Sequence, residues 1–143
     1  MMNNIIYFFT FLILLNISCV SPPEYSDGLL ENNPAIINES DFFSLSIYTE
    51  NYSENEIWDL NFSLLESDIL LSTLIIKDLN ISSSDSSSLT ILSGNNDTLL
   101  TVLLKEEFVW TSVDTLYNYG LPEKAVLKSD NLTGRLEFQM LKL

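Results

Sequence analysis

Hydrophobic and polar residues alternate with a period of two along much of the chain after residue 41. In the run Trp58–Leu64, apolar side chains occupy every second position and polar ones stand between them. The segment Leu136–Met140 repeats this alternation near the C-terminus. Because successive side chains of a β-strand point to opposite faces, the pattern predicts strands with one buried and one exposed face.

Further segments have the composition of strands. Phe43–Ile47 also alternates, whereas Ile69–Ile76 is apolar on both faces and fits a central strand. Gly94-Asn95-Asn96-Asp97 predicts a hairpin turn, because Gly and Asn tolerate the positive φ values of tight turns. Four more strands are predicted at Leu89–Ser93, Thr98–Leu104, Phe108–Val113 and Lys124–Lys128, with a connecting loop over 117–122.

Short strands at this spacing, without an amphipathic helical pattern, predict an all-β fold. We expect an antiparallel β-sandwich of immunoglobulin-like or fibronectin-like build. A small β-barrel is the alternative. The length of 143 residues has room for one such domain, which the alternating pattern places at 41–143.

The N-terminus has a different pattern. Ile5–Leu15 is an apolar run broken only by Thr10, and no charged residue occurs before Glu24. Such a run has the length of the apolar part of a secretory signal, whereas a membrane-spanning helix needs about 20 apolar residues. The run is followed by Ser18 and Cys19 and then by Pro22-Pro23, so we expect a signal peptide over 1–18.

A small residue followed by a cysteine at the end of an apolar run resembles a bacterial lipoprotein signal. The resemblance implies that Cys19 becomes the first residue of the mature chain and carries acyl chains that hold it to a membrane. It covers about the first twenty residues, and two features depart from the pattern: Asn16 stands where Leu is usual, and no Lys or Arg precedes the run. The alternative is an ordinary secretory signal that leaves a free thiol.

Residues 19–40 are rich in Pro, Ser, Asn and acidic residues, which predicts an extended acidic tether after the lipidated cysteine. The formal charge is −14. Eleven acidic residues, from Glu24 to Asp68, occur before the first basic residue, Lys77. A field of this sign repels phosphates, so nucleic acid is excluded as a partner. After Cys19, six N-x-Ser/Thr sequons occur, and the abundance of Asn, Ser and Thr accounts for them by chance: they begin at Asn38, Asn51, Asn61, Asn80, Asn96 and Asn131.

The chain has no histidine, and this limits its chemistry. Ser-His-Asp and Cys-His catalysis and the usual zinc sites are excluded, and with four glycines there is no phosphate-binding loop. Carboxylates remain, but no spacing selects a catalytic pair among Asp59, Glu66, Asp68, Glu106 and Glu107. We therefore expect a protein that is not an enzyme and needs no cofactor.

Two kinds of ligand contact stay open as weaker alternatives. Asn95, Asn96 and Asp97 offer oxygen atoms of the kind that calcium accepts, although a plain turn uses the same residues, and no metal is expected. Tyr117 and Tyr119 lie in a predicted loop and are candidates for contact with a ligand such as a glycan. Trp58 and Trp110 lie on apolar strand faces and are expected in the core.

These observations lead to one expected function. The chain is predicted to be a non-catalytic lipoprotein, anchored to the membrane at the cell envelope, whose β-sandwich binds a protein partner there. A secreted module that binds a glycan or calcium is the alternative. The residues do not indicate the partner, the membrane or the oligomeric state.

Overall fold

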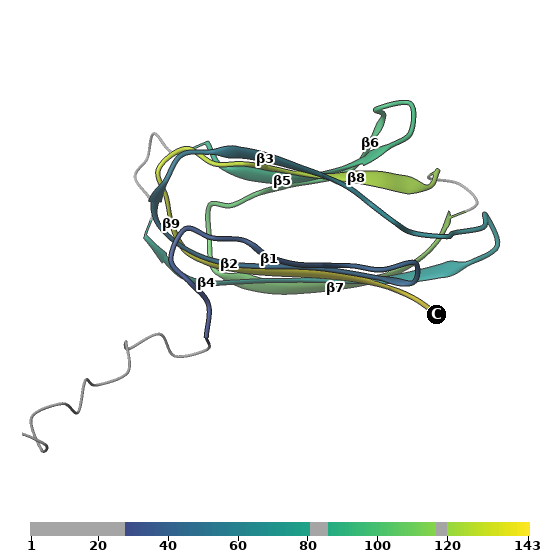
Figure 1. The fold of residues 1–143 in the computed structure, drawn as a ribbon, viewed down its shortest axis with the longest axis horizontal. Coiled ribbons are helices and arrows are strands. Elements are labelled where there is room, and N and C mark those ends of the chain that lie inside the picture. Colours follow the sequence, from purple (N-terminus) through teal and green to yellow (C-terminus); the bar gives the residue numbers. More distant parts are fainter. Residues whose placement is uncertain (1–27, 81–85, 117–119) are drawn as a thin grey trace, which may run out of the picture.

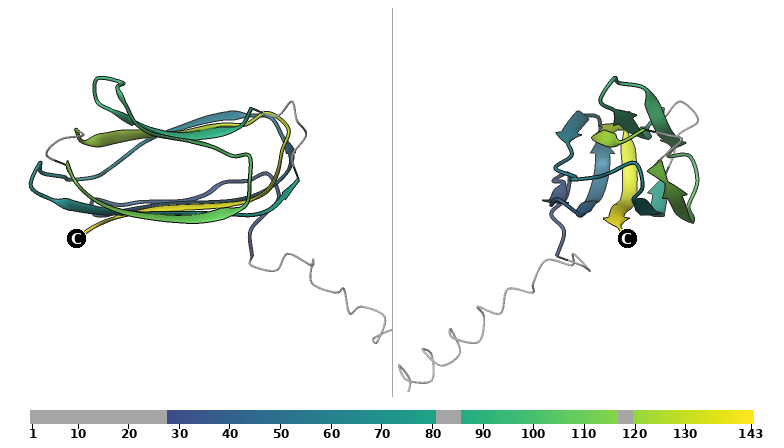
Figure 2. Two further views of the ribbon diagram at one scale, coloured as in Figure 1. Left: turned by 180° about the vertical axis from the view of Figure 1, so that it is seen from behind. Right: turned by 90° about the vertical axis from the view of Figure 1, so that its right-hand side faces the viewer.

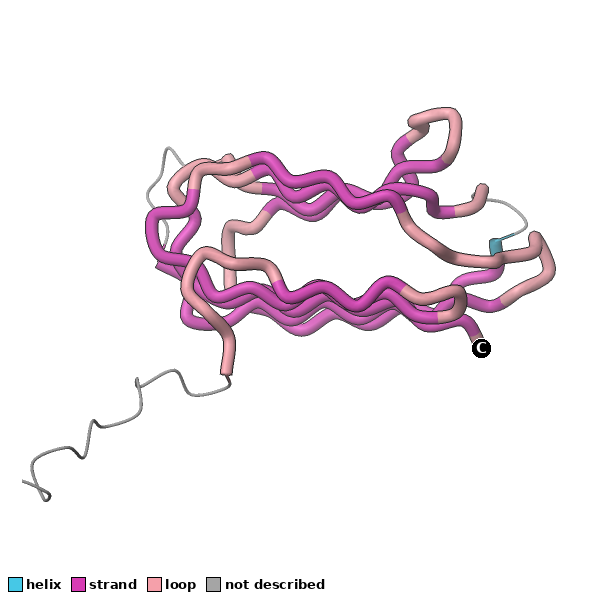
Figure 3. Tube along the Cα trace, viewed as in Figure 1, coloured by secondary structure: helices cyan, strands magenta, loops and turns pink. Residues whose placement is uncertain are grey.

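The computed structural model describes residues 28–80, 86–116 and 120–143, which form two facing antiparallel β-sheets (Figures 1 and 3). Most of the strands contain an apolar or alternating run of the sequence. The strands are β1 Ala35–Asn38, β2 Phe42–Tyr52, β3 Asn55–Asp59, β4 Ile69–Asn80, β5 Ser88–Ser93, β6 Thr98–Leu103, β7 Phe108–Thr115, β8 Pro122–Lys128 and β9 Leu132–Lys142.

The strand order describes a jelly roll. One sheet has the order β1-β2-β9-β4-β7 and the other β3-β8-β5-β6. The antiparallel pairs β5·β6, β4·β7, β3·β8 and β2·β9 are nested in the sequence, each pair enclosing the one before it. A long hairpin-like ribbon that folds over itself into two sheets has this connectivity.

The core lies between the sheets and is built from the inward positions of alternating strands. Phe43, Leu45 and Ile47 on β2 and Leu136 and Phe138 on β9 are buried. The rings of Phe43 and Phe138 meet edge to face with their centres 6.4 Å apart. Leu89, Ala125 and Leu127 cover them from the other sheet. Apolar burial of this kind is the main favourable term in the folding of the sandwich.

The predicted antiparallel β-sandwich is confirmed, and the two sheets do not close into the alternative barrel. The strand order is that of a jelly roll, however, and not the expected immunoglobulin-like or fibronectin-like build. Ile69–Ile76 lies inside β4, between β7 and β9, as the apolar character of both its faces predicts. The hairpin of Leu89–Ser93 and Thr98–Leu104 is present as β5 and β6. The other predicted strands correspond to β2, β7, β8 and β9.

The run Trp58–Leu64 differs from its prediction as a single strand. β3 ends at Asp59, and residues 60–64 cross from one sheet toward the other: Leu60 N–H donates to the Glu123 carbonyl and Ser63 N–H to the Ser40 carbonyl, at 2.8 Å each. Leu60, Phe62 and Leu64 still pack against the core. A half-buried connection shows the same alternation as a half-buried strand.

β1 lies within the segment that the sequence assigned to the tether, at Ala35–Asn38. It pairs with β2 in four consecutive positions, from Ala35 with Ser46 to Asn38 with Phe43. The Asn38 side chain donates to the Asp59 carbonyl at 2.7 Å and accepts from Asn61 N–H at 2.9 Å. The ordered domain therefore begins before residue 41.

Candidate functional site

The sandwich has two sides at which the edge strands of its sheets lie, and these sides differ in how the two sheets are connected. Edge strands β1 and β3 lie on one side, and β6 and β7 lie on the other (Figure 2). On the first side, Asn38 joins β1 to the segment after β3, and residues 60–64 cross between the sheets. We call the side formed by β6 and β7 the open side.

Three of the four edge strands carry features that discourage pairing with another chain. β1 has four residues and follows Pro34, and β3 has five residues and carries Glu56 and Asp59. β6 is interrupted by a register shift where it pairs with β5, at Ile91 and Leu92. Short length, charge, proline and bulges are the usual protections of an exposed edge.

β7 lacks three of these protections, namely short length, proline and a bulge, and it carries a single charge. Its eight residues, Phe108–Thr115, pair with β4 without a register shift. The strand contains no proline, glycine or lysine, and its only charged residue is Asp114. A regular, nearly uncharged edge strand offers a row of unpaired backbone donors and acceptors to an additional strand.

The outer face of the sheet beside β7 carries several apolar side chains. Val109 and Val113 on β7 are 70% and 62% exposed. Leu71 on β4 lies between Val113 and Leu141 in the strand register, and Ile75 lies beside Val109. Together with Ile69 and Leu141, these side chains form what we call the outer patch: Ile69, Leu71, Ile75, Val109, Val113 and Leu141.

A pocket of about 290 Å³ opens between the sheets on the open side. The sizes of the inward-facing side chains of β4 and β7 explain why this space exists. Leu74 and Trp110 lie side by side and fill their part of the interior, whereas the next inward pair, Ser72 and Ser112, is small and leaves space. Apolar residues from the other sheet close the far wall: Ile91, Leu99, Leu100 and Pro122.

The pocket has one charged group in its lining. Asp114 follows Ser112 on the inward face of β7, and the Ser112 hydroxyl donates to its carboxylate. An apolar cavity with a hydroxyl and a carboxylate near its mouth suits a small ligand, or a single side chain, that has an apolar body and a donor group. Its volume is at the small end of ligand sites in proteins.

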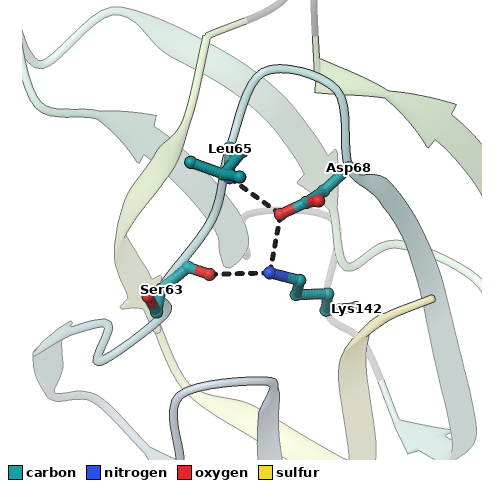
Figure 4. Close-up of polar contacts among 4 residues, drawn as sticks. All are labelled: Ser63, Leu65, Asp68 and Lys142. Carbon is teal, nitrogen blue, oxygen red and sulfur yellow. Dashed lines mark hydrogen bonds and ion pairs between the residues drawn. The ribbon is translucent and has the colours of Figure 1, made fainter.

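The end of the sandwich near the C-terminus is held by a separate polar cluster (Figure 4). The Lys142 ammonium lies 2.7 Å from an Asp68 carboxylate oxygen and donates to the Ser63 carbonyl at 2.9 Å. The same Asp68 oxygen accepts from Leu65 N–H at 2.8 Å. These bonds, led by that from Lys142, hold the pKa of Asp68 below its usual range. The cluster ties the turn before β4 to the end of β9.

The predicted calcium ligands form a turn. Asn96 N–H and Asp97 N–H donate to the carbonyl and hydroxyl of Ser93, at 2.8 and 3.1 Å, and Asn96 has φ +62°. The Asn96 side-chain oxygen accepts from the Lys124 ammonium at 3.1 Å. Among the described residues, no group of three or more His, Cys, Asp or Glu side chains is placed to hold a metal.

The remaining predicted site residues cannot be located. Cys19, Tyr117 and Tyr119, like the predicted signal peptide, lie outside the described residues. Within the described ranges, no helix has the length and apolar character needed to cross a membrane.

Of the acidic residues considered for catalysis, Asp68 belongs to the polar cluster, and Glu107 accepts from Leu79 N–H at 3.1 Å. Sequence reasoning placed Trp110 in the core; it is half-buried and lines the pocket. The sequence analysis did not identify β7 as an open edge. The absence of Pro, Gly and basic residues from Phe108–Val113 was the signal for that feature.

Comparisons with known proteins do not identify a family. No family model matches the chain, and no curated protein matches it. A solved structure of the Bacillus endospore appendages, described as a family of disulfide-linked pili, is similar over 76% of this chain and 88% of that one. The sequence identity is 11% and the TM-score 0.43. A likeness at this level carries no argument about function.

Proposed function

We propose that this protein is a non-catalytic lipoprotein, anchored at the cell envelope through Cys19, whose β-sandwich binds a partner on its open side. The anchor rests on the sequence alone: an apolar run that ends in Ser18-Cys19. The interaction rests on one observation, the regular, nearly uncharged edge of β7 beside the outer patch. Exposed apolar surface next to a regular strand edge favours contact with another protein.

The arrangement of the domain supports this proposal. The residues just before β1 contact β2: Glu31 forms a bridge with Tyr48, and Asn32 N–H donates to the Tyr48 carbonyl, so the chain enters the domain at the edge of the sheet opposite β7. A chain held from that side would leave β7 accessible. The negative charge of the molecule would also keep it from adhering to anionic headgroups.

Intact mass spectrometry of the mature protein tests the anchor. The wild-type chain should begin at Cys19 and carry a mass increment equal to two or three acyl chains. Cys19→Ala should lack that increment and be released from membranes. A mature wild-type chain with an unmodified thiol would refute the anchoring part of the proposal.

The pocket favours a second candidate function, a module that binds a small glycan. Trp110 lines the pocket together with Ser112 and Asp114, and an aromatic ring beside hydroxyl and carboxylate groups suits a sugar. Titration with soluble glycans should then quench the fluorescence of Trp110. Trp110→Phe should abolish the change, whereas Trp58→Phe should keep it, because Trp58 is not among the pocket residues. Equal quenching in both variants would exclude this pocket.

A further inference from the structure

The edge of β7 is complementary to itself. In an antiparallel pair of two β7 strands related by a two-fold axis at Thr111, Thr111 faces the partner's Thr111. Val109 then faces the partner's Val113, and Val113 faces the partner's Val109. All of these side chains are on the outer face of the sheet, as the β4·β7 register shows. Branched apolar pairs and Thr–Thr pairs are among the favourable cross-strand contacts.

We propose that the partner on the open side is a second copy of this chain, joined edge to edge through β7 to make a continuous sheet. This assignment deepens the proposed function, on which it rests for the role of the open side. The pairing extends the outer patch of one copy into that of the other. It also gives hydrogen-bond partners to the backbone groups along both edges.

The charges of β7 do not oppose this pairing. Asp114 faces the partner's Phe108, so the two Asp114 carboxylates are separated by six residues along the strand, about 20 Å. That distance exceeds the Debye length of about 10 Å at 0.1 M salt. Two obstacles remain: the partner's Glu106 and Glu107, which precede β7 and lie within two positions of Asp114 in this register, and the charge of −14 on each copy. Both favour separation at low salt. Added salt should therefore strengthen the dimer, whereas it would weaken binding to a basic partner.

The register can be tested with a single cysteine. Cys19→Ala in the full chain removes the only native thiol and makes the test independent of the anchor. Thr111→Cys in that background places two thiols directly opposite each other, at a Cα separation that a disulfide can bridge. Mild oxidation should convert it to a covalent dimer that a reducing agent dissolves.

Thr115→Cys is the matched control on the same strand. Thr115 is exposed, as Thr111 is, but the two copies would hold these positions about 26 Å apart, too far for a disulfide. Thr101→Cys on β6 controls for random collision at the other edge of the open side. Cross-linking of Thr111→Cys no faster than either control would overturn the proposal.

A second measurement follows the dimer without a cross-link. Sedimentation of the Cys19→Ala chain should show a monomer–dimer equilibrium that added sodium chloride shifts toward the dimer. Val109→Lys should remove the dimer, and Val109→Thr should retain it. Val109 is 70% exposed, so both variants should keep the circular dichroism of the folded monomer. A monomer at every concentration and salt level would overturn the second-copy assignment, while the mass measurement on Cys19 would still decide the anchor.

Discussion

Some titratable side chains have pKa values in the folded state that differ from those in the unfolded chain, so they make the stability of the protein depend on pH. Tyr52, at the end of β2, donates its hydroxyl to a carboxylate oxygen of Glu56 at 3.2 Å. Burial, together with the negative charge of Glu56, raises the pKa of Tyr52 to about 12. An unfolded tyrosine titrates near pH 10, so the folded state holds this proton more tightly.

The Tyr52 proton should therefore stabilise the fold fully below about pH 10 and cease to do so as the pH rises toward 12. Tyr52→Phe should remove this part of the alkaline decline in stability. Urea denaturation from pH 9 to pH 12 would measure it. Glu56→Gln should reduce the decline only in part, because burial remains. Parallel curves for wild type and Tyr52→Phe would contradict the assignment.

Asp68 acts in the opposite range of pH. Its pKa is lowered by the hydrogen bond from Lys142 and then by Leu65 N–H. The stabilisation is therefore present above the pKa of an unfolded aspartate, about 3.9, and is lost as the pH falls through the lower pKa of the folded state. In acid titrations followed by circular dichroism, Asp68→Asn and Lys142→Gln should both unfold less steeply than wild type below about pH 4. A steep acid transition kept by both variants would argue against this role.

At the scale of elements, β9 is shaped by a single glycine. Gly134 has φ +148°, and a Cβ atom there would lie 3.0 Å from Leu79 Cα and 3.1 Å from the Lys77 carbonyl oxygen. The register of β4 against β9 shifts between Lys77 and Asn80, beside this point. The Thr49 hydroxyl on β2 donates to the Gly134 carbonyl at 3.0 Å. Gly134 thus allows β4 to approach β9 closely at this position.

Gly134→Ala should lower the free energy of unfolding by roughly 1–3 kcal/mol, through backbone strain and close contact with β4. Gly120→Ala is the control, since Gly120 also has a left-handed φ of +80° but its nearest neighbours lie 3.8 Å from the added Cβ. Gly120→Ala should lower the free energy of unfolding by less than Gly134→Ala does. Urea denaturation of both variants would compare them, and an equal loss would mean that the close approach to Leu79 is unimportant.

The existence of the elements could be predicted from the sequence, but their partners could not. Alternation at Leu136–Met140 and the apolar character of Ile69–Ile76 depend on local burial, which leaves a record in the residues themselves. Pairing of β2 with β9 joins segments about ninety positions apart, and no local pattern records it. The same limit applies to the pocket, which depends on Ser72 and Ser112 becoming neighbours across two strands. β1 was missed because four residues are too few for a periodic signal.

The whole molecule is dominated by one sign of charge. Twenty acidic residues against six basic ones give the formal charge of −14, so the folded state carries considerable self-repulsion. The ion pairs that the described residues show, such as Lys77 with Glu137 at 3.7 Å, engage only a few of these acids. Burial of the apolar core therefore has to offset the repulsion between the negative charges in the folded state.

Sodium chloride should therefore raise the melting temperature. At about 0.1 M salt the Debye length falls to roughly 10 Å, and charges further apart than this are largely screened. Melting followed by circular dichroism at increasing sodium chloride would measure the effect at a protein concentration too low for association. Sucrose at matched osmolality is the control for general exclusion from the surface. A melting temperature that falls with salt would mean that attractive charge pairs outweigh the repulsion.

The nested ribbon has a consequence for how the chain reaches its final shape. The innermost hairpin, β5 with β6, needs only a four-residue closure, whereas β9 must find β2 and β4 across most of the domain. Loop-closure entropy favours assembly from that hairpin outward. Because β9 is synthesised after every other strand described, and fills the gap between β2 and β4, we expect the larger sheet to stay in two halves until β9 is available. A chain whose larger sheet is still incomplete could pass through a translocation channel in an unfolded form until β9 had been synthesised.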